Sequence, residues 1–264
     1  MKTEGGRRKA EGSVLVCFPL KQEAAPFRKI ATNKPGTAIL LTGIGRQNAE
    51  KSLRKYLAGG ASNSSRPAEI PASRVRHVSA SQARLVSSLA PPSLVLTCGF
   101  AGGLNPDLKL GDVVFEMGNA PLSPPSGERV SARTGEGLLS KLLAVGAKPT
   151  KFFCADHVAT TAAEKQKLRH ETGADAVEME SAAIHAVCVE QGIPCVTVRV
   201  ISDMASEDLP LDFNQLSRAD KSLDYGKLFL AVAKSPGKIG ALMKLQKQTQ
   251  FAAERLAEVL ARTL

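Results

Sequence analysis

Short apolar runs alternate along the chain with longer segments in which apolar residues recur at helical spacing. The runs predict strands at Val14–Phe18, Ala38–Thr42, Ser93–Thr97, Asp112–Glu116, Lys151–Cys154 and Cys195–Ile201. The longer segments predict helices at Asn48–Ala58, Gly135–Val145, Ala163–Glu171, Met179–Glu190 and Tyr225–Ala233. Strands that alternate with helices in this way indicate an α/β domain with a largely parallel, buried sheet.

The rest of the chain divides into a leader, loops and a tail. Residues 1–12 have no apolar periodicity and predict a disordered basic lead, while the Gly-, Ser- and Pro-rich stretches 59–73 and 118–130 predict surface loops. We expect one domain over residues 13–234 and a C-terminal helical extension over residues 235–264. The extension combines apolar positions at helical spacing with lysines and arginines. It therefore packs on the body or on a second subunit, or binds peripherally to an anionic membrane.

Composition is typical of an ordinary globular protein. The chain has 264 residues, of which 43% are hydrophobic, so it can bury a large core without a disulfide or a metal. No apolar run approaches the roughly 18 residues of a membrane-spanning helix. The five cysteines show no metal-ligand spacing, which favours free thiols in a reducing compartment and no bound metal. We therefore expect a cytoplasmic protein.

The net charge of +10 raises the question of nucleic-acid binding. Residues 1–12 contribute +2 and residues 227–264 contribute +5, which leaves only +3 for the body between them. Aromatic side chains that could stack on bases are few, since the chain holds nine Phe, two Tyr and no Trp. The charge is peripheral, and we expect no nucleic-acid partner.

Two glycine-rich segments follow predicted strands. Cys98–Leu104 reads CGFAGGL and predicts either a turn whose backbone N–H groups approach a ligand or a tight loop between two strands. Thr42–Asn48 reads TGIGRQN and lies between a strand and a helix. Asn48 replaces the third glycine of a dinucleotide fingerprint, and no acidic residue follows at the required distance. The second segment could hold an anion at a helix start, but it does not predict a cofactor site.

Carboxylates gather in two C-terminal segments. Glu178 and Glu180 alternate around Met179 where a helix begins, so they either cap that helix or belong to a site. The apolar strand Cys195–Ile201 leads directly into Ser202 and Asp203. The carboxyl end of a parallel strand is where α/β sheets bind their ligands, although a Ser-Asp pair there can also cap a helix. Arg199 lies inside the same strand, and a buried arginine needs a carboxylate or an anion as partner.

Three of these segments together resemble a known family. Gly99–Val114, Val177–Cys188 and Ile193–Asp203 are similar to motifs of the nucleoside phosphorylase/nucleosidase superfamily, in the same order and spacing. This superfamily includes purine and uridine phosphorylases and the 5′-methylthioadenosine/S-adenosylhomocysteine nucleosidases. The resemblance runs from about Val14 to Leu216. It implies a three-layer α/β/α sandwich around a mixed, largely parallel central sheet, assembled as a homodimer or a larger homo-oligomer.

The resemblance also implies a reaction and the residues that perform it. The reaction is cleavage of the N-glycosidic bond of an adenosine-type purine nucleoside, with release of adenine. Asp203, with Ser202 beside it, corresponds to the acid that must carry a proton to N7 of the purine. Glu180 corresponds to the group that binds the ribose hydroxyls, with Met179 against the sugar and Glu178 in support.

The same resemblance assigns the nucleophile and the base contacts. Glu23 corresponds to a glutamate that activates water, although from the sequence alone it could equally be a solvated first-turn residue. Arg199 corresponds to an arginine that helps to place the water or a phosphate. The backbone of the segment around Val158 and Ala159 binds the base, and His157 is a bystander. The glycine segment contributes further substrate-binding residues, which are Gly99, Phe100, Ala101 and Gly102.

Two features depart from the nucleosidase pattern. Phe100 replaces a serine whose hydroxyl helps to hold the water. The glycine segment and the long C-terminus also resemble hopanoid-associated phosphorylases, which remove adenine from an adenosyl-lipid. Hydrolysis and phosphorolysis therefore both stay open, with inorganic phosphate as co-substrate in the second case and no cofactor in either. A nucleoside-binding module without activity is the non-enzymatic alternative, although the intact Asp203 and Glu180 speak against it.

Overall fold

The computed structural model describes residues 13–31, 34, 36–59, 91–117, 130–216 and 236–264. Its strands are β1 (Val14–Phe18), β2 (Thr37–Leu41), β3 (Leu94–Gly103), β4 (Val113–Met117), β5 (Lys148–Pro149), β6 (Phe152–Cys154), β7 (Ala176–Glu178) and β8 (Cys195–Asp203). Its helices are α1 (Lys21–Ala31), α2 (Arg46–Leu57), α3 (Val130–Ala144), α4 (Ala162–Thr172), α5 (Ser181–Glu190), α6 (Phe213–Leu216) and α8 (Ile239–Thr263). A short 3-10 turn, Pro236–Lys238, leads into α8.

The eight strands form one mixed sheet. Its order is β2-β1-β3-β8-β4-β5, and β7 and β6 join beside the end of β3. Neighbours run parallel except where β4 lies against β8 and β7 against β3. Every residue of β8 is buried, as expected for a central strand covered on both faces.

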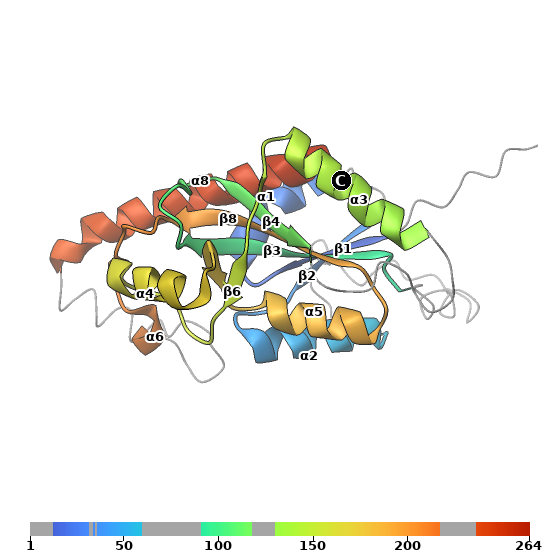
Figure 1. The fold of residues 1–264 in the computed structure, drawn as a ribbon, viewed down its shortest axis with the longest axis horizontal. Coiled ribbons are helices and arrows are strands. Elements are labelled where there is room, and N and C mark those ends of the chain that lie inside the picture. Colours follow the sequence, from blue (N-terminus) through green and yellow to red (C-terminus); the bar gives the residue numbers. More distant parts are fainter. Residues whose placement is uncertain (1–12, 32–33, 35, 60–90, 118–129, 217–235) are drawn as a thin grey trace, which may run out of the picture.

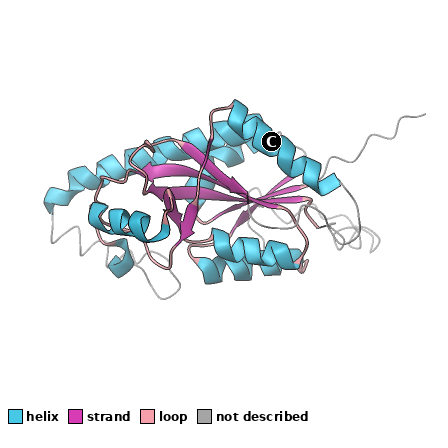
Figure 2. Cartoon of the chain, viewed as in Figure 1, coloured by secondary structure: helices cyan, strands magenta, loops and turns pink. Residues whose placement is uncertain are grey.

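Helices cover both faces of the sheet (Figures 1 and 2). On one face α1, α3 and α8 pack on apolar side chains of β1, β3, β4 and β8. On the other face α2 and α5 pack on β1, β2 and the start of β8. The predicted three-layer α/β/α sandwich around a mixed, largely parallel sheet is therefore confirmed.

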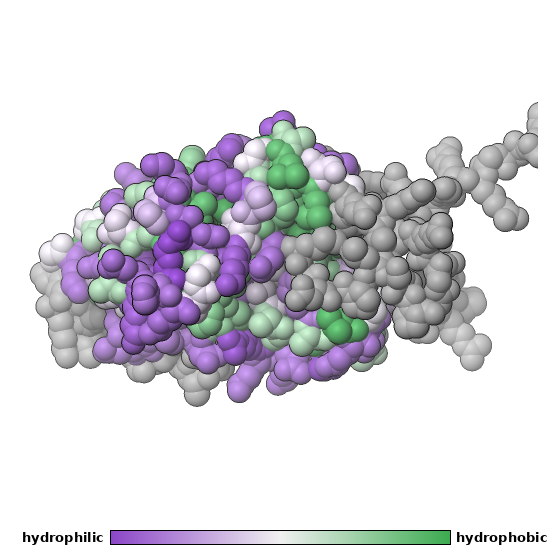
Figure 3. Space-filling view, viewed as in Figure 1, coloured by the Kyte–Doolittle hydropathy of each residue, from purple (hydrophilic) through white to green (hydrophobic). Residues whose placement is uncertain are grey.

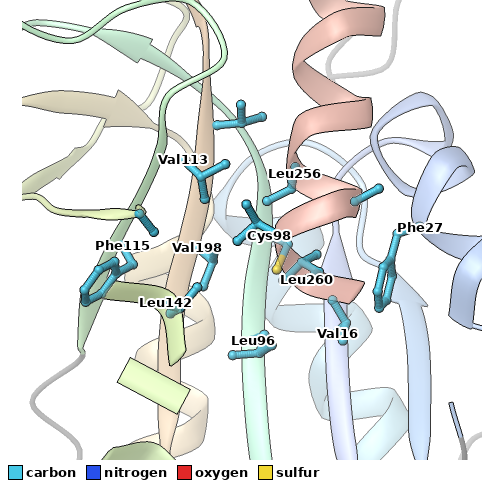
Figure 4. Packing of buried hydrophobic residues seen from close by; sticks show 14 of the residues in the cluster. Val16, Phe27, Leu96, Cys98, Val113, Phe115, Leu142, Val198, Leu256 and Leu260 are labelled. Carbon is cyan, nitrogen blue, oxygen red and sulfur yellow. The ribbon is translucent and has the colours of Figure 1, made fainter. Parts of the chain in front are cut away.

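The C-terminal helix α8 is part of the core along its second half. Leu256 and Leu260 are buried there between α1 and the sheet, close to Phe27 of α1 and Cys98 of β3 (Figure 4). The first half of α8 extends past this core. In this half Met243 is 56% exposed. The predicted extension thus packs on the body of this chain along its C-terminal half.

The molecular surface seen in Figure 3 is mostly polar, with apolar surface gathered over α3. Leu143 of α3 is 55% exposed. Among the described residues, no helix is both long enough and apolar enough to cross a membrane.

The predicted strands are confirmed, with β3 and β8 both longer than their apolar runs. One prediction is corrected: Cys98–Gly103 is not a turn but the second half of β3, because it stays paired with β8 and then with β7. Helix α1 and strand β7 were not among the predicted elements. The predicted lead, the helix Tyr225–Ala233 and nearly all of the two predicted loops lie outside the described residues.

Candidate active site

A cavity of about 380 Å³ opens at the carboxyl ends of β1, β3 and β8, which run parallel and therefore end at one edge of the sheet. Most of the residues predicted for the site line this cavity. They are Glu23, Phe100, Ala101, Gly102, Val158, Ala159, Glu178, Met179, Glu180, Ser202 and Asp203. Gly99 and Arg199, which were also predicted for the site, do not line the cavity. Among the described lining residues there is no Lys or Arg, whereas four are carboxylates.

Arg199 is fully buried and pairs with the carboxylates of the Glu178–Glu180 segment. Its Nη2 atom donates to Glu178 Oε2 at 2.6 Å and lies 3.2 Å from Glu180 Oε2. The prediction that a buried strand arginine needs a carboxylate is confirmed. Within the described part of the chain, the Nε and Nη1 atoms of Arg199 have no hydrogen-bond partner.

Glu178 acts as the cap of α5 and as the main partner of Arg199. Its Oε2 atom accepts from the N–H groups of Glu180 and Ser181, and its Oε1 atom accepts from the Ser181 hydroxyl. Burial opposes ionisation of Glu178, but Arg199 and these hydrogen bonds outweigh it and lower its pKa. Glu178 is therefore an ionised carboxylate whose acceptor positions face the protein.

Glu180 faces the cavity from the first residue before α5. Its Oε1 atom accepts from the Gly45 N–H at 2.8 Å, at the start of α2. The second glycine segment thus does bind an anion at a helix start, and that anion is the protein's own side chain. Burial and the neighbouring Glu178 raise the pKa of Glu180, while Arg199 and the Gly45 N–H oppose the rise.

Glu23 is buried in the first turn of α1, so it is not a solvated residue. Its Oε2 atom accepts from the Leu20 N–H and its Oε1 atom accepts from the Phe100 N–H, both at 2.9 Å. Burial raises the pKa of Glu23 to about 7, although the Phe100 N–H and Arg199 oppose the rise. A carboxyl with this pKa exchanges a proton near neutral pH, as a general base requires.

Gly99 lets these groups approach one another. Its φ is +148°, and a Cβ atom on it would lie 2.7 Å from Arg199 Nη1 and 3.0 Å from Glu23 Oε1. Any larger residue would therefore strain the backbone and displace both charged side chains. The glycine that the sequence assigns to a ligand-binding turn in fact makes room for Arg199 and Glu23.

Asp203 ends β8 and is held by two donors. The Ser202 hydroxyl donates to Asp203 Oδ1 at 2.7 Å, and Lys165 Nζ of α4 lies 2.6 Å from Asp203 Oδ2. Asp203 lines the cavity at this end and is not a helix cap, because β8 is followed by a turn rather than by a helix. Sequence reasoning did not identify Lys165, which lies in a polar helix.

The segment expected to meet the base is held by α6. Asn214 donates to the Val158 carbonyl and accepts from the Val158 N–H, each at 2.9 Å. His157 pairs with Glu164 and also borders the cavity. Phe213, Leu245 and Thr249 also line the cavity, the last two from α8. Their contribution was not predicted, because it depends on where α6 and α8 pack.

The fold and the site together define a class: three-layer α/β/α proteins with a carboxylate-lined cavity at the ends of the parallel strands. A model of the phosphorylase superfamily matches residues 142–234 of this chain, which confirms the likeness predicted from the motifs. This matched range contains the Glu178–Glu180 segment, Arg199 and Asp203.

Individual relatives carry nucleosidase names. The chain is 30% identical over 148 residues to an aminodeoxyfutalosine nucleosidase of Campylobacter jejuni, which covers 50% of this chain and 64% of the relative. It is 31% identical over 152 residues to a 5′-methylthioadenosine/S-adenosylhomocysteine nucleosidase of Haemophilus ducreyi, with the same coverage. The matched part thus spans just under two thirds of the length of each of these two relatives.

A solved structure agrees with the fold over nearly the whole chain. The futalosine hydrolase of Helicobacter pylori superimposes with a TM-score of 0.59 at 16% identity, covering 96% of this chain and 97% of that one. At this identity the likeness shows the shared fold. In the described residues, no group of His, Cys, Asp and Glu side chains could hold a metal ion.

Proposed function

We propose that the protein hydrolyses the N-glycosidic bond of a purine nucleoside, and that the nucleoside is of the adenosine type. The observation that carries the proposal is the grouping of Glu23, Glu180 and Asp203 in one cavity. Glycosidic cleavage passes through a positively charged, oxocarbenium-like sugar, and it needs an acid for the leaving group and a base for water. The three carboxyl groups supply these functions: Glu23 comes from the first turn of α1, Glu180 from the residue before α5, and Asp203 from the end of β8.

In the proposed mechanism each group has a separate task. Asp203 delivers a proton to N7 of the purine, so that the base leaves as a neutral molecule. Glu180 accepts hydrogen bonds from the ribose hydroxyls and stabilises positive charge on the sugar. Glu23 takes a proton from the attacking water, and its pKa of about 7 suits that task at neutral pH.

Phe100 supports the base even though it cannot hold the water by a hydroxyl. Its backbone N–H donates to Glu23 Oε1, which fixes one carboxylate oxygen. The Leu20 N–H fixes the other. Glu23 is therefore oriented by the main chain, and we assign the water itself to the remaining lone pairs of its carboxylate.

Electrostatics favour water over phosphate as the nucleophile. A phosphate dianion entering the cavity would meet Glu23, Glu178, Glu180 and Asp203, and no described lining residue is Lys or Arg. Arg199 cannot compensate, because its charge is already matched by Glu178 and Glu180. The N–H of Phe100, which could have bound phosphate, is bonded to Glu23. Phosphorolysis, including that of a lipid-linked nucleoside, is therefore the weaker alternative.

Support for an adenosine-type substrate comes from the relatives' names, which include 5′-methylthioadenosine/S-adenosylhomocysteine nucleosidases. We assign recognition of the base to the backbone around Val158 and Ala159, which border the cavity together with Asp203. Water is the second substrate of the proposed hydrolysis, and the reaction needs no cofactor.

The test is release of free base from a panel of nucleosides. Adenosine, methylthioadenosine and S-adenosylhomocysteine are each incubated with the protein, and adenine is quantified by chromatography. We expect adenine from at least one of them, and a loss of about 10²-fold or more in kcat for Asp203→Asn, which cannot donate the proton. Binding of a nucleoside without release of any base would support the non-enzymatic module instead.

A further inference from the structure

Lys165 is a buried lysine placed directly behind the proposed acid. It lies in α4, is 0% exposed, and does not line the cavity. Lysine is rarely buried in this way unless its charge is matched. Its Nζ atom lies 2.6 Å from Asp203 Oδ2, so Asp203 is the matching charge.

The hydrogen bonds around Lys165 define where the proton resides at rest. Nζ donates to the carbonyl oxygens of Met204 and Glu207, both at 2.9 Å, as well as facing Asp203. Two carbonyl oxygens and one carboxylate oxygen surround Nζ, as suits an ammonium group. Asp203 meanwhile accepts from the Ser202 hydroxyl at Oδ1 and is ion-paired with Lys165 at Oδ2, as suits an ionised carboxylate. The acid therefore holds no proton of its own in this arrangement.

From this geometry, and resting on the proposed function, we infer that Lys165 supplies the proton that Asp203 passes to the purine. Lys165 acts through Asp203 and does not touch the substrate, so it is a positioning residue that also stores the proton. A carboxyl group that is paired with a cation can in this way still serve as an acid.

At the start Lys165 carries the proton and Asp203 is a carboxylate. Nζ transfers this proton to Asp203, which leaves Lys165 neutral. As the C1′–N9 bond breaks, its electron pair stays with the purine, and N7 takes the proton from Asp203, which becomes a carboxylate again. Water adds its oxygen to C1′ and gives its proton to Glu23. That proton then returns through solvent to Lys165, so the enzyme ends each turnover as it began.

A second cavity of about 250 Å³ also reaches Asp203 and gives solvent a route to the ion pair through that carboxyl group. Its lining combines apolar side chains with Glu207, Asp208, Lys244 and Gln248. The charged groups that face the Lys165–Asp203 pair from this side are therefore Glu207, Asp208 and Lys244, of which Lys244 is bonded to Glu207. The titratable groups that share the main cavity with Asp203 are Glu23, Glu178, Glu180 and His157.

The experiment measures kcat against pH for the wild type and for Lys165→Met, with the nucleoside that the wild type cleaves best. Without Lys165 the proton must be held by the carboxyl alone, so the alkaline limb of the profile is expected to move to lower pH. Near neutral pH we expect a loss of about 10²-fold in kcat with little change in KM. As the pH falls, the activity of Lys165→Met should approach that of the wild type.

Two controls separate proton supply from a loss of structure. Lys167→Met changes an exposed lysine of the same helix, 73% exposed at its side chain, and should behave as the wild type does. Lys165→Gln keeps amide donors for the Met204 and Glu207 carbonyls but has no proton to give. It should show the same pH profile as Lys165→Met and serves in its place if that variant does not fold.

Several results would overturn the inference. A Lys165 variant with wild-type kcat would do so, as would a loss of equal size at every pH, which is what a merely structural role predicts. Introducing Lys165→Met into the Asp203→Asn variant should lower kcat little further. A double variant whose loss in kcat equals the product of the two single losses would contradict action through Asp203. If the wild type releases no base from any nucleoside, the proposed function fails, which is distinguishable from failure of the Lys165 inference alone.

Discussion

Replacing Glu23 by glutamine should lower activity and change how stability depends on pH. The pKa of Glu23 is raised from 4.5 to about 7 by folding, and each unit corresponds to about 1.4 kcal/mol. The folded state therefore binds more protons than the unfolded state between these values. This contribution to stability is fully present below about pH 4.5 and is lost as the pH rises through about 7, a total of about 3 kcal/mol.

Glutamine removes this dependence. It has one acceptor oxygen for the N–H groups of Leu20 and Phe100, so one hydrogen bond is lost, at a cost of about 1 kcal/mol at every pH. Glu23→Gln should therefore be less stable than the wild type near pH 5 by about 1 kcal/mol. Near pH 8 it should be more stable by about 2 kcal/mol, because the wild type then buries an ionised carboxylate.

The assay is urea unfolding of both proteins at several pH values, with the slope m compared to exclude a change in the unfolded state. A difference in unfolding free energy that stays constant between about pH 5 and 8 would refute the reasoning about Glu23. The same variant should lose about 10²-fold or more in kcat, since it cannot accept the proton of the water.

Two further substitutions test other parts of the site. Glu180→Gln should raise KM and lower kcat for a ribonucleoside. With a 2′,3′-dideoxy substrate, which the wild type already cleaves poorly, the same variant should lose little further activity. Equal losses of activity on the two substrates would show that Glu180 does not contact the ribose hydroxyls. Gly99→Ala should lower both stability and kcat, because its Cβ meets Arg199 Nη1 and Glu23 Oε1, whereas Gly137→Ala in α3, where a Cβ has open space, should not. A fully active Gly99→Ala protein would contradict the close approach at that position.

The sequence predicted those parts of the molecule that depend on local pattern. Strand β8 is an apolar run that ends in Ser202 and Asp203, so both the strand and the position of the acid could be inferred. Helix α1 was not predicted, because Pro26 interrupts its interior and its apolar pattern is short. The burial of Glu23 in that helix was missing from the prediction for the same reason.

Tertiary contacts decide the features that the sequence could not show. Lys165 and Lys167 lie two residues apart in one polar helix, and only packing against the segment after β8 makes the first a buried partner of Asp203. The glycines of Cys98–Gly103 are typical of a turn. Pairing with β8 on one side and β7 on the other extends them into a strand instead. Propensity is a weak guide wherever such pairing is available.

The most direct test of the central claim is to identify the atom that attacks C1′. The protein is incubated with a nucleoside that it cleaves, in oxygen-18-labelled water with excess inorganic phosphate, and the sugar product is analysed by mass spectrometry. We predict free sugar that carries one labelled oxygen at C1′ and is formed at the same rate with and without phosphate. Formation of a sugar 1-phosphate, or a rate that requires phosphate, would contradict the assignment of Glu23 as the base that activates water.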